Sequence, residues 1–159
     1  MVILGASGLA KEIATSLLWD NYRNEIVFFD NISKIIDPNI EDNYKVIRDE
    51  KQLERYFSEV DRAFCIGVGS PKNREFLMSL AISKGGIVKS IIASSALIGG
   101  FGTTVSRGAT ILSGATITAN VVVGVGSLIN KNSVLSHDVD VGRYVEICPC
   151  AKLLGNVKV

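Results

Sequence analysis

The sequence has few residues of the kinds that mark nucleic-acid binding, metal binding or membrane insertion. Among its 159 residues, Lys and Arg number 17 and Asp and Glu number 16, which gives a net charge of +1 with no basic run. It contains one histidine, and aromatic residues make up only 7%. No apolar stretch approaches the roughly 18 residues that a membrane-spanning helix requires. We therefore expect neither a nucleic-acid partner nor a membrane partner.

Cysteine is also scarce, and its spacing does not suit a zinc site. Cys65 stands alone, and Cys148 and Cys150 form a C-x-C pair that is tighter than the usual C-x₂-C clip. With a single histidine available, no metal cofactor is expected. Free thiols favour a reducing compartment, and no signal peptide precedes the first apolar run. These features predict a cytoplasmic protein.

The last third of the chain carries a strict repeat of six residues. From residue 105 onward every sixth residue is aliphatic: Val105, Ile111, Ile117, Val123, Ile129, Leu135, Val141, Ile147, Leu153 and Val159. Four residues after each comes another residue of inward size: Ala109, Ala115, Val121, Ser127, Ser133, Val139, Val145, Ala151 and Val157. A period of six suits neither a helix nor an isolated strand and predicts a parallel β-helix.

The first part of the chain alternates apolar strands with helices. Strands are predicted at residues 2–4, 26–29, 44–47, 63–66 and 87–92, and helices at residues 8–19, after Asp49 and at residues 70–84. Uninterrupted apolar strands that alternate with helices are typical of a parallel sheet covered by helices. The fold class expected is therefore an α/β, Rossmann-like subdomain followed by an all-β parallel β-helix.

The two patterns meet near residue 91 and predict the domain boundaries. Ile91 and Leu97 already keep the six-residue step, but Leu97 is eight residues before Val105. Two extra residues therefore fall in the glycine-rich stretch 99–104. We assign residues 1–90 to the α/β domain, 91–104 to an irregular connecting turn and 105–159 to the β-helix.

A glycine turn after the first strand is a candidate phosphate loop. Gly5-Ala6-Ser7-Gly8 follows a strand and opens a helix, so backbone N–H groups can face an anion at the helix N-terminus. The full dinucleotide pattern G-x-G-x-x-G is absent, and about 90 residues supply only one mononucleotide-sized half, which disfavours NAD. The alternatives left open are a nucleotide or sugar-phosphate ligand, with Asp30 near the ribose or base, and a turn that needs glycine for conformation alone.

The repeat also predicts which side chains point outward. Its fourth position is rich in Gly, Asn and Asp, which indicates a corner with positive φ. If three hexads make one turn, residues 18 apart stack, and His137 lies on an outward corner below Gly155 with a gap that suits a slender ligand. A lone histidine is more often a surface residue than a catalyst, and the corner position by itself accounts for Asp138.

Several segments together resemble a bacterial family. They are Val2-Ile3-Leu4-Gly5-Ala6-Ser7-Gly8-Leu9-Ala10-Lys11-Glu12, Phe29-Asp30-Asn31, Ile66-Gly67, Asn130-Lys131-Asn132-Ser133-Val134-Leu135-Ser136-His137-Asp138, Val141-Gly142 and Ala151-Lys152-Leu153-Leu154-Gly155-Asn156-Val157. The chain resembles the hexapeptide-repeat sugar acyltransferases, which include sialic acid O-acetyltransferases and UDP-4-amino-sugar N-acetyltransferases of the bacillosamine pathway.

The resemblance implies a left-handed β-helix, a homotrimer and an acetyl-CoA co-substrate. It implies that His137 is the general base and that Asp138 orients its imidazole. Two positions match the acetyl-CoA groove, Asn130 and Gly155, and Glu146 stands where a second histidine reaches the acetyl-CoA site. The positions that match the nucleotide-sugar loop are Gly5, Ser7, Gly8, Asp30 and Gly67.

The sequence departs from the family at three points. Leu9 replaces a histidine of the glycine loop, Glu146 replaces the second histidine, and the repeat stops at Val159 although the family continues for several hexads. An uncovered β-helix end normally needs a cap. We therefore expect either a missing C-terminal portion or an impaired acetyl-CoA site.

The favoured function is N-acetylation of a nucleotide-linked amino sugar by acetyl-CoA. The alternatives are O-acetylation of sialic acid or another sugar, and a non-catalytic trimeric binding or assembly subunit. A γ-type carbonic anhydrase on the same coil would need three zinc-binding histidines, and the chain has one.

Overall fold

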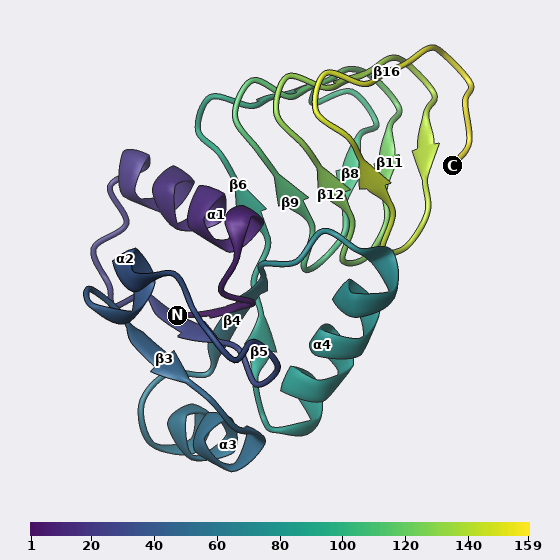
Figure 1. The fold of residues 1–159 in the computed structure, drawn as a ribbon. Coiled ribbons are helices and arrows are strands. Elements are labelled where there is room, and N and C mark those ends of the chain that lie inside the picture. Colours follow the sequence, from purple (N-terminus) through teal and green to yellow (C-terminus); the bar gives the residue numbers. More distant parts are fainter. The chain divides into compact units, whose positions relative to one another are not determined.

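The computed structural model describes residues 1–159 and contains two compact units (Figure 1). The α/β unit comprises Met1–Gly69 and Asn73–Lys89, and the coil unit comprises Ser70–Lys72 and Ser90–Val159. Each unit has its own secondary structure and hydrophobic core, as expected for segments that bury their apolar faces separately.

The α/β unit is built on a five-stranded parallel sheet. Its strands are β1 (Val2–Leu4), β2 (Val27–Phe29), β3 (Lys45–Ile47), β4 (Ala63–Ile66) and β5 (Ile87–Val88), in the order β3-β2-β1-β4-β5. The central strand β1 is completely buried, and Phe28 and Phe29 of β2 are 1% exposed. Burial on both faces explains why these strands read as continuous apolar runs.

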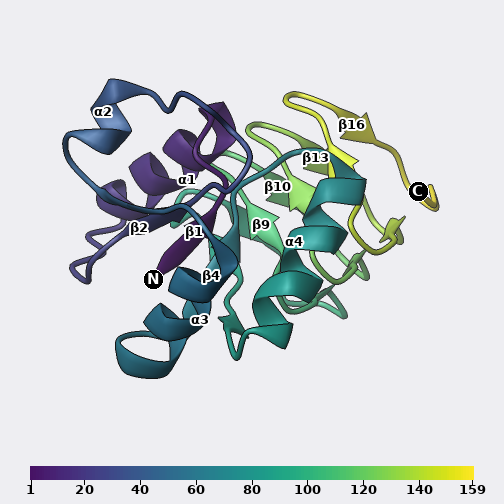
Figure 2. The same cartoon turned by 60° about the horizontal axis from the view of Figure 1, so that its bottom comes forward.

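Helices cover both faces of this sheet. They are α1 (Gly8–Trp19), α2 (Pro38–Glu41), α3 (Glu50–Glu59) and α4 (Pro71–Ser83). Figures 1 and 2 show α1 and α2 on one side of the sheet and α3 on the other, as right-handed crossovers require when the strand order reverses. No helix combines the length and the apolar character needed to cross a membrane.

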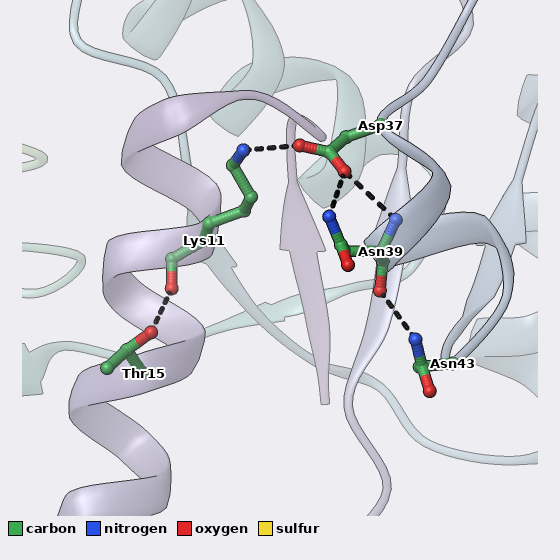
Figure 3. A network of polar contacts seen from close by, with 5 residues as sticks. All are labelled: Lys11, Thr15, Asp37, Asn39 and Asn43. Carbon is green, nitrogen blue, oxygen red and sulfur yellow. Dashed lines mark hydrogen bonds and ion pairs between the residues drawn. The ribbon is translucent and has the colours of Figure 1, made fainter.

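The short helix α2 was not predicted from the sequence, and side-chain contacts define it. The Asp37 carboxylate accepts a hydrogen bond from the Asn39 N–H at 2.9 Å and so caps the helix, and Pro38 occupies its first turn. Asp37 also pairs with Lys11 of α1 (Figure 3). The hydrogen bond from Lys11 and those from Asn39 lower the pKa of the Asp37 carboxyl to about 2.

The coil unit is a parallel β-helix of two-residue strands (Figure 1). Its strands are β6 (Ile91–Ile92), β7 (Leu97–Ile98), β8 (Thr104–Val105), β9 (Thr110–Ile111), β10 (Thr116–Ile117), β11 (Val122–Val123), β12 (Leu128–Ile129), β13 (Val134–Leu135), β14 (Asp140–Val141), β15 (Glu146–Ile147) and β16 (Lys152–Leu153). They form three sheets, in the orders β16-β13-β10-β7, β14-β11-β8 and β15-β12-β9-β6. The predicted fold class is confirmed.

The predicted stacking interval of 18 residues is also confirmed. Leu128 pairs with Thr110 on one side and with Glu146 on the other, 18 residues away in each direction. The inward aliphatic residues form one buried core that includes Ile111, Ile117, Ile129 and Leu135. Two inward serines are satisfied within the coil: the Ser127 hydroxyl donates to the Gly142 carbonyl at 2.7 Å, and the Ser133 hydroxyl to the Asn130 carbonyl at 2.6 Å.

The first turn of the coil differs from the prediction. Ile98, not Leu97, pairs with Ile117, and Leu97 is 67% exposed. Ile98 is seven residues before Val105, whereas Ile117 is six before Val123, so the irregular turn holds one extra residue rather than two. The predicted strand 87–92 is also wrong, because β5 pairs with β4 and β6 pairs with β9. A continuous apolar run does not show where one strand ends and the next begins in a different sheet.

The corner position has the predicted backbone conformation throughout the repeat. Positive φ angles occur at Gly108, Gly114, Asn120, Gly126, Asn132, Asp138, Tyr144, Cys150 and Asn156. Glycine, asparagine and aspartate reach this left-handed region at the lowest cost, which explains their frequency at the fourth position of the hexad. Asp138 therefore occupies a corner that favours its residue type for conformational reasons alone.

Candidate functional site

The glycine loop of the α/β unit lies where the strand order of its sheet reverses. Gly5 follows β1 with a φ of +116°, and its N–H donates to the Phe29 carbonyl at 2.8 Å. A Cβ at Gly5 would lie 2.8 Å from Cγ1 of Val68, so only glycine fits between the neighbouring strand ends. In open α/β sheets, ligands bind at the carboxyl ends of the strands at such a switch point.

A hollow of about 210 Å³ opens at this switch point. It is lined by residues 5–7 after β1, residues 29–33 at the end of β2 and beyond it, Val68 after β4, and Asn73, Phe76 and Leu77 of α4. Of the predicted binding residues, Gly5, Ser7 and Asp30 line it. No lysine or arginine lines the hollow, so an anion there would depend on backbone N–H groups.

Asp30 is held by its own loop. One carboxylate oxygen accepts from the Ser33 N–H at 2.8 Å and from the Ile32 N–H at 3.0 Å, and the other accepts from the Ser33 hydroxyl at 2.8 Å. Burial raises the pKa of Asp30, but these hydrogen bonds and the charge of Arg48 outweigh burial, and the pKa lies below its ordinary value. The ionised carboxylate shapes the loop and retains acceptor capacity.

The other predicted residues of the loop have different surroundings. Ser7 precedes α1 without making a side-chain capping bond, and a Cβ at Gly8 would meet no atom within 4 Å. Gly67 is tightly enclosed, since a Cβ there would lie 2.6 Å from Cγ2 of Ile3 and 2.9 Å from the Leu4 carbonyl oxygen. Ser7 and Gly8 thus leave room beside the start of α1, whereas Gly67 allows close packing of β1 and β4.

A larger hollow of about 450 Å³ lies elsewhere on the same unit. Its lining includes Arg62 and Gly85, which precede β4 and β5, so it lies at the amino ends of these strands. Lys84 at this hollow is paired with Glu54 at 3.6 Å. The smaller hollow is the better ligand site, because it lies at the carboxyl ends and contains the glycine turn.

In the coil unit, His137 and Asp138 form a directed pair. They occupy the corner between β13 and β14, and Nδ1 of His137 lies 2.8 Å from Oδ2 of Asp138. The hydrogen bonds from His137 and Asn120 lower the pKa of the Asp138 carboxyl. An ionised carboxylate can only accept, so Nδ1 donates to it, and in the neutral imidazole Nε2 then presents its lone pair. This arrangement suits a general base.

The space next to Gly155 is taken by His137 itself. A Cβ at Gly155 would lie 2.4 Å from Cε1 and 2.7 Å from Nε2 of the His137 ring. The sequence predicted an open gap for a slender ligand above the histidine, and this detail is wrong. The imidazole leans into the space that the glycine leaves, because the two residues occupy successive layers.

The remaining predicted acetyl-CoA residues lie on other parts of the coil. Asn130 follows β12, is 6% exposed, and its side-chain oxygen accepts from the Lys131 N–H at 2.9 Å. Glu146 begins β15 and pairs with Leu128 in a different sheet from β13. The structure thus brings together His137, Asp138 and Gly155 at one corner and places Asn130 and Glu146 away from that corner.

Two residues at these sites were missed by the sequence analysis. Asn120 donates from Nδ2 to Oδ1 of Asp138 at 3.1 Å. Asn120 precedes Asp138 by 18 residues, and this spacing could have predicted that the two side chains stack. The sequence analysis missed the contact because the corner pattern already explained why an asparagine stands at position 120. Arg74 of α4 is fully buried and donates to the Val68 carbonyl at 2.8 Å, which supports the loop at the hollow. No group of three or more His, Cys, Asp or Glu side chains gathers to hold a metal ion.

Comparison with known protein families gives one match for the first half of the chain. Residues 1–80 match the family described as the PglD N-terminal domain. The matched segment contains the glycine turn, Asp30 and Gly67. Among curated proteins, a sequence search found no match.

Solved structures share the fold over nearly the whole chain. A mutant of perosamine N-acetyltransferase from Caulobacter crescentus, in complex with CoA and GDP-perosamine, is 23% identical with a TM-score of 0.85, and the match covers 99% of this chain and 72% of that one. The acetyltransferase domain of PglB from Neisseria gonorrhoeae is 23% identical with a TM-score of 0.85, covering 99% and 75%. The same domain in complex with acetyl coenzyme A is 22% identical with a TM-score of 0.84, covering 99% and 74%.

Proposed function

The chain belongs to the PglD N-terminal domain family, and from this membership we propose that it is an acetyl-CoA-dependent acetyltransferase acting on a nucleotide-linked amino sugar. The observation that carries the proposal is the contact of 2.8 Å between Nδ1 of His137 and Oδ2 of Asp138. It leaves Nε2 of an exposed imidazole ready to accept a proton.

The proposed reaction is attack of the sugar amine on the thioester carbonyl of acetyl-CoA. A C–N bond forms, the C–S bond breaks, and the proton lost by the nitrogen passes to Nε2 of His137, which then delivers it to the CoA thiolate. Asp138 stabilises the imidazolium that forms, because its carboxylate accepts from Nδ1 in both protonation states. Backbone N–H groups of the coil are proposed to stabilise the oxyanion.

Acetyl-CoA is proposed to bind to the coil unit, where Gly155, Asn130 and Glu146 match the positions expected to contact it. Support comes from the acetyltransferase domain of PglB, whose structure was solved with acetyl coenzyme A. Asn130 and Glu146 lie away from His137 on the coil, so they would contact parts of the co-substrate other than the thioester. A homotrimer, expected from the sequence resemblance, is part of the same proposal.

The nucleotide is proposed to bind at the switch point of the α/β unit. The hollow of about 210 Å³ is smaller than the roughly 300–1,000 Å³ of typical ligand pockets, so it would hold only a portion of a nucleotide sugar. Phosphate groups suit the side at Ser7 and Gly8, close to the N-terminus of α1. The Asp30 carboxylate would repel phosphate and suits the ribose hydroxyls, which donate hydrogen bonds.

An amine acceptor is favoured over a hydroxyl acceptor by the structural comparison. Support comes from the perosamine N-acetyltransferase, which was solved with GDP-perosamine. A nucleotide-binding loop also suits an activated sugar better than free sialic acid.

The test is thiol release from acetyl-CoA with matched acceptors. UDP-linked and GDP-linked 4-amino sugars are compared with the same sugars carrying a 4-hydroxyl group, and with sialic acid. We expect turnover with an amino sugar only. Turnover with the hydroxyl compounds alone would indicate O-acetylation. No turnover with any acceptor, by a protein shown to be folded, would favour a non-catalytic subunit. Light scattering of the same sample tests the trimer.

A further inference from the structure

One corner of the coil forms a column of stacked residues that includes Asp138. Gly102, Asn120, Asp138 and Asn156 occupy equivalent corners in successive layers, each with a positive φ. Backbone hydrogen bonds hold the layers together: the Asn120 N–H donates to Phe101 at 2.8 Å, and the Asp138 N–H to Ala119 at 3.0 Å. The side chains in this column therefore start from fixed positions.

The Asn120 carboxamide lies between Gly102 on one side and Asp138 on the other. Its oxygen lies over Gly102, where an added Cβ would come within 2.2 Å of it. Its nitrogen points to the next layer and donates to Oδ1 of Asp138 at 3.1 Å. Because Gly102 has no side chain, the Asn120 amide oxygen can lie next to it. The amide nitrogen then points toward the Asp138 carboxylate.

Asp138 is consequently held from two directions. Its Oδ1 accepts from Asn120, and its Oδ2 is 2.8 Å from Nδ1 of His137. Both the Asp138 side chain, 43% exposed, and the His137 side chain, 64% exposed, are open to water. Packing does not confine the carboxylate, so the two hydrogen bonds must select its orientation.

We propose that Asn120 is a positioning residue that acts through Asp138. By fixing the carboxylate, Asn120 keeps the proton of the neutral imidazole on Nδ1 and the lone pair on Nε2. Its effect on turnover rests on the proposed acetyl transfer with His137 as general base. Its effect on the imidazole is a property of the coil and does not depend on any substrate.

The simpler explanation of Asn120 is that the corner requires a residue tolerant of positive φ. Asn132 provides the comparison, because it has the same φ of 56° and its amide oxygen lies over Gly114, where an added Cβ would come within 2.1 Å. One layer above Asn132 is Cys150, not a carboxylate. Backbone geometry therefore accounts for both asparagines, but Asn120 in addition donates a hydrogen bond to the Asp138 carboxylate.

The decisive experiment compares Asn120→Gly with Asn132→Gly. Glycine tolerates the corner conformation, so each variant removes one carboxamide without adding backbone strain. His137 is the only histidine, and its ring ¹⁵N shifts in a labelled sample therefore report the tautomer of the neutral imidazole directly. We expect the Nδ1-protonated form to dominate in the wild type and in Asn132→Gly, and to decrease in Asn120→Gly.

Kinetics add the second readout. For Asn120→Gly we expect kcat to fall about tenfold, with the KM for acetyl-CoA unchanged; this is the lower end of the loss seen when a hydrogen-bond partner that orients a metal ligand is removed. Asn132→Gly should match the wild type. If Asn120→Gly does not fold, Asn120→Asp replaces it, since a second carboxylate beside Asp138 should disturb the same orientation.

The two proposals fail in different ways. If the wild type acetylates no acceptor, the proposed function is wrong, and the tautomer measurement alone decides the role of Asn120. If turnover depends on His137 but the tautomer or kcat of Asn120→Gly matches that of Asn132→Gly, the inference about Asn120 is overturned and the proposed function stands.

Discussion

The imidazole of His137 lies in the space that a side chain at position 155 would fill. A Cβ on Gly155 would be 2.4 Å from Cε1, 2.7 Å from Nε2 and 3.0 Å from Nδ1 of the ring. The glycine is therefore a condition for the observed orientation of the histidine. A residue that the sequence suggested as part of a co-substrate groove also decides where the general base of the proposed reaction lies.

Replacing Gly155 by alanine should impair catalysis more than folding. Relief of a contact at 2.4 Å requires the ring to move by about 1 Å to reach ordinary van der Waals separation. A displacement of that size at a reacting group can cost about 10²-fold in rate, and we expect this loss in kcat. Gly100→Ala is the matched control, because a Cβ there meets no atom within 4 Å. Equal kcat values for the two variants would contradict this role of Gly155.

Replacing His137 by alanine should remove the general base of the proposed reaction. We expect kcat to fall by about 10²–10⁴-fold, while the circular dichroism spectrum and the Kd for acetyl-CoA remain close to the wild type. The side chain is largely exposed, so its loss leaves no cavity in the core. Turnover within a fewfold of the wild type would remove His137 from the mechanism.

Two glycines of the α/β unit should differ in how well they tolerate alanine. At Gly67 the new methyl group would lie 2.6 Å from Ile3 and 2.9 Å from the Leu4 carbonyl oxygen, and we expect a loss of about 1–3 kcal/mol in the free energy of unfolding. At Gly8, the first residue of α1, the methyl meets nothing within 4 Å, and stability should stay within about 1 kcal/mol of the wild type.

Urea unfolding followed by far-ultraviolet circular dichroism measures this difference, because α1, α2 and α3 all lie in the α/β unit. If Gly67→Ala proves as stable as Gly8→Ala, the strand ends that flank Gly67 are less rigid than the close approach implies.

The contact between Lys11 and Asp37 should make stability depend on pH. The pKa of Asp37 in the folded chain is about 2, below its ordinary value of 3.8, chiefly because of the hydrogen bond from Lys11. The contribution of Asp37 is therefore fully present above about pH 4 and is lost as the pH falls toward 2. Asp37→Asn should lower the urea midpoint slightly at pH 7, and its difference from the wild type should shrink below about pH 4.

The effect should be small because both side chains remain partly open to solvent, at 45% for Lys11 and 29% for Asp37. Lys11→Met provides the control: in this background, Asp37→Asn should change the midpoint less than it does in the wild type. A difference that is independent of both pH and Lys11 would show that the ion pair does not hold α2.

The regular part of the coil could be predicted closely from the sequence. The strands from β8 onward, the interval of 18 residues and the positive φ at positions such as Asn120, Asp138 and Cys150 agree with the six-residue pattern. The family resemblance is also confirmed by the match of residues 1–80. The prediction worked because each layer of a β-helix repeats the same inward and outward positions at a constant offset.

The prediction failed where the constant offset is broken. Leu97 was expected inside the coil, but a single extra residue in the following turn makes Ile98 the partner of Ile117. Helix α2 has only four residues, too few to show a helical period, and its start depends on the Asp37 cap. An irregular turn and a short capped helix leave little periodic signal in one sequence.

In the candidate site, too, the features that follow from the repeat could be predicted, and the individual side-chain contacts could not. The sequence by itself determined that His137 and Asp138 share a corner and that Gly155 lies one layer away, because chain offset and layer position are equivalent in a repeating coil. Only the tertiary structure decided that the His137 ring fills the space at Gly155 and that Asn120 holds Asp138. These contacts depend on side-chain torsions and on the neighbours present in adjacent layers, and a six-residue period carries no information about either.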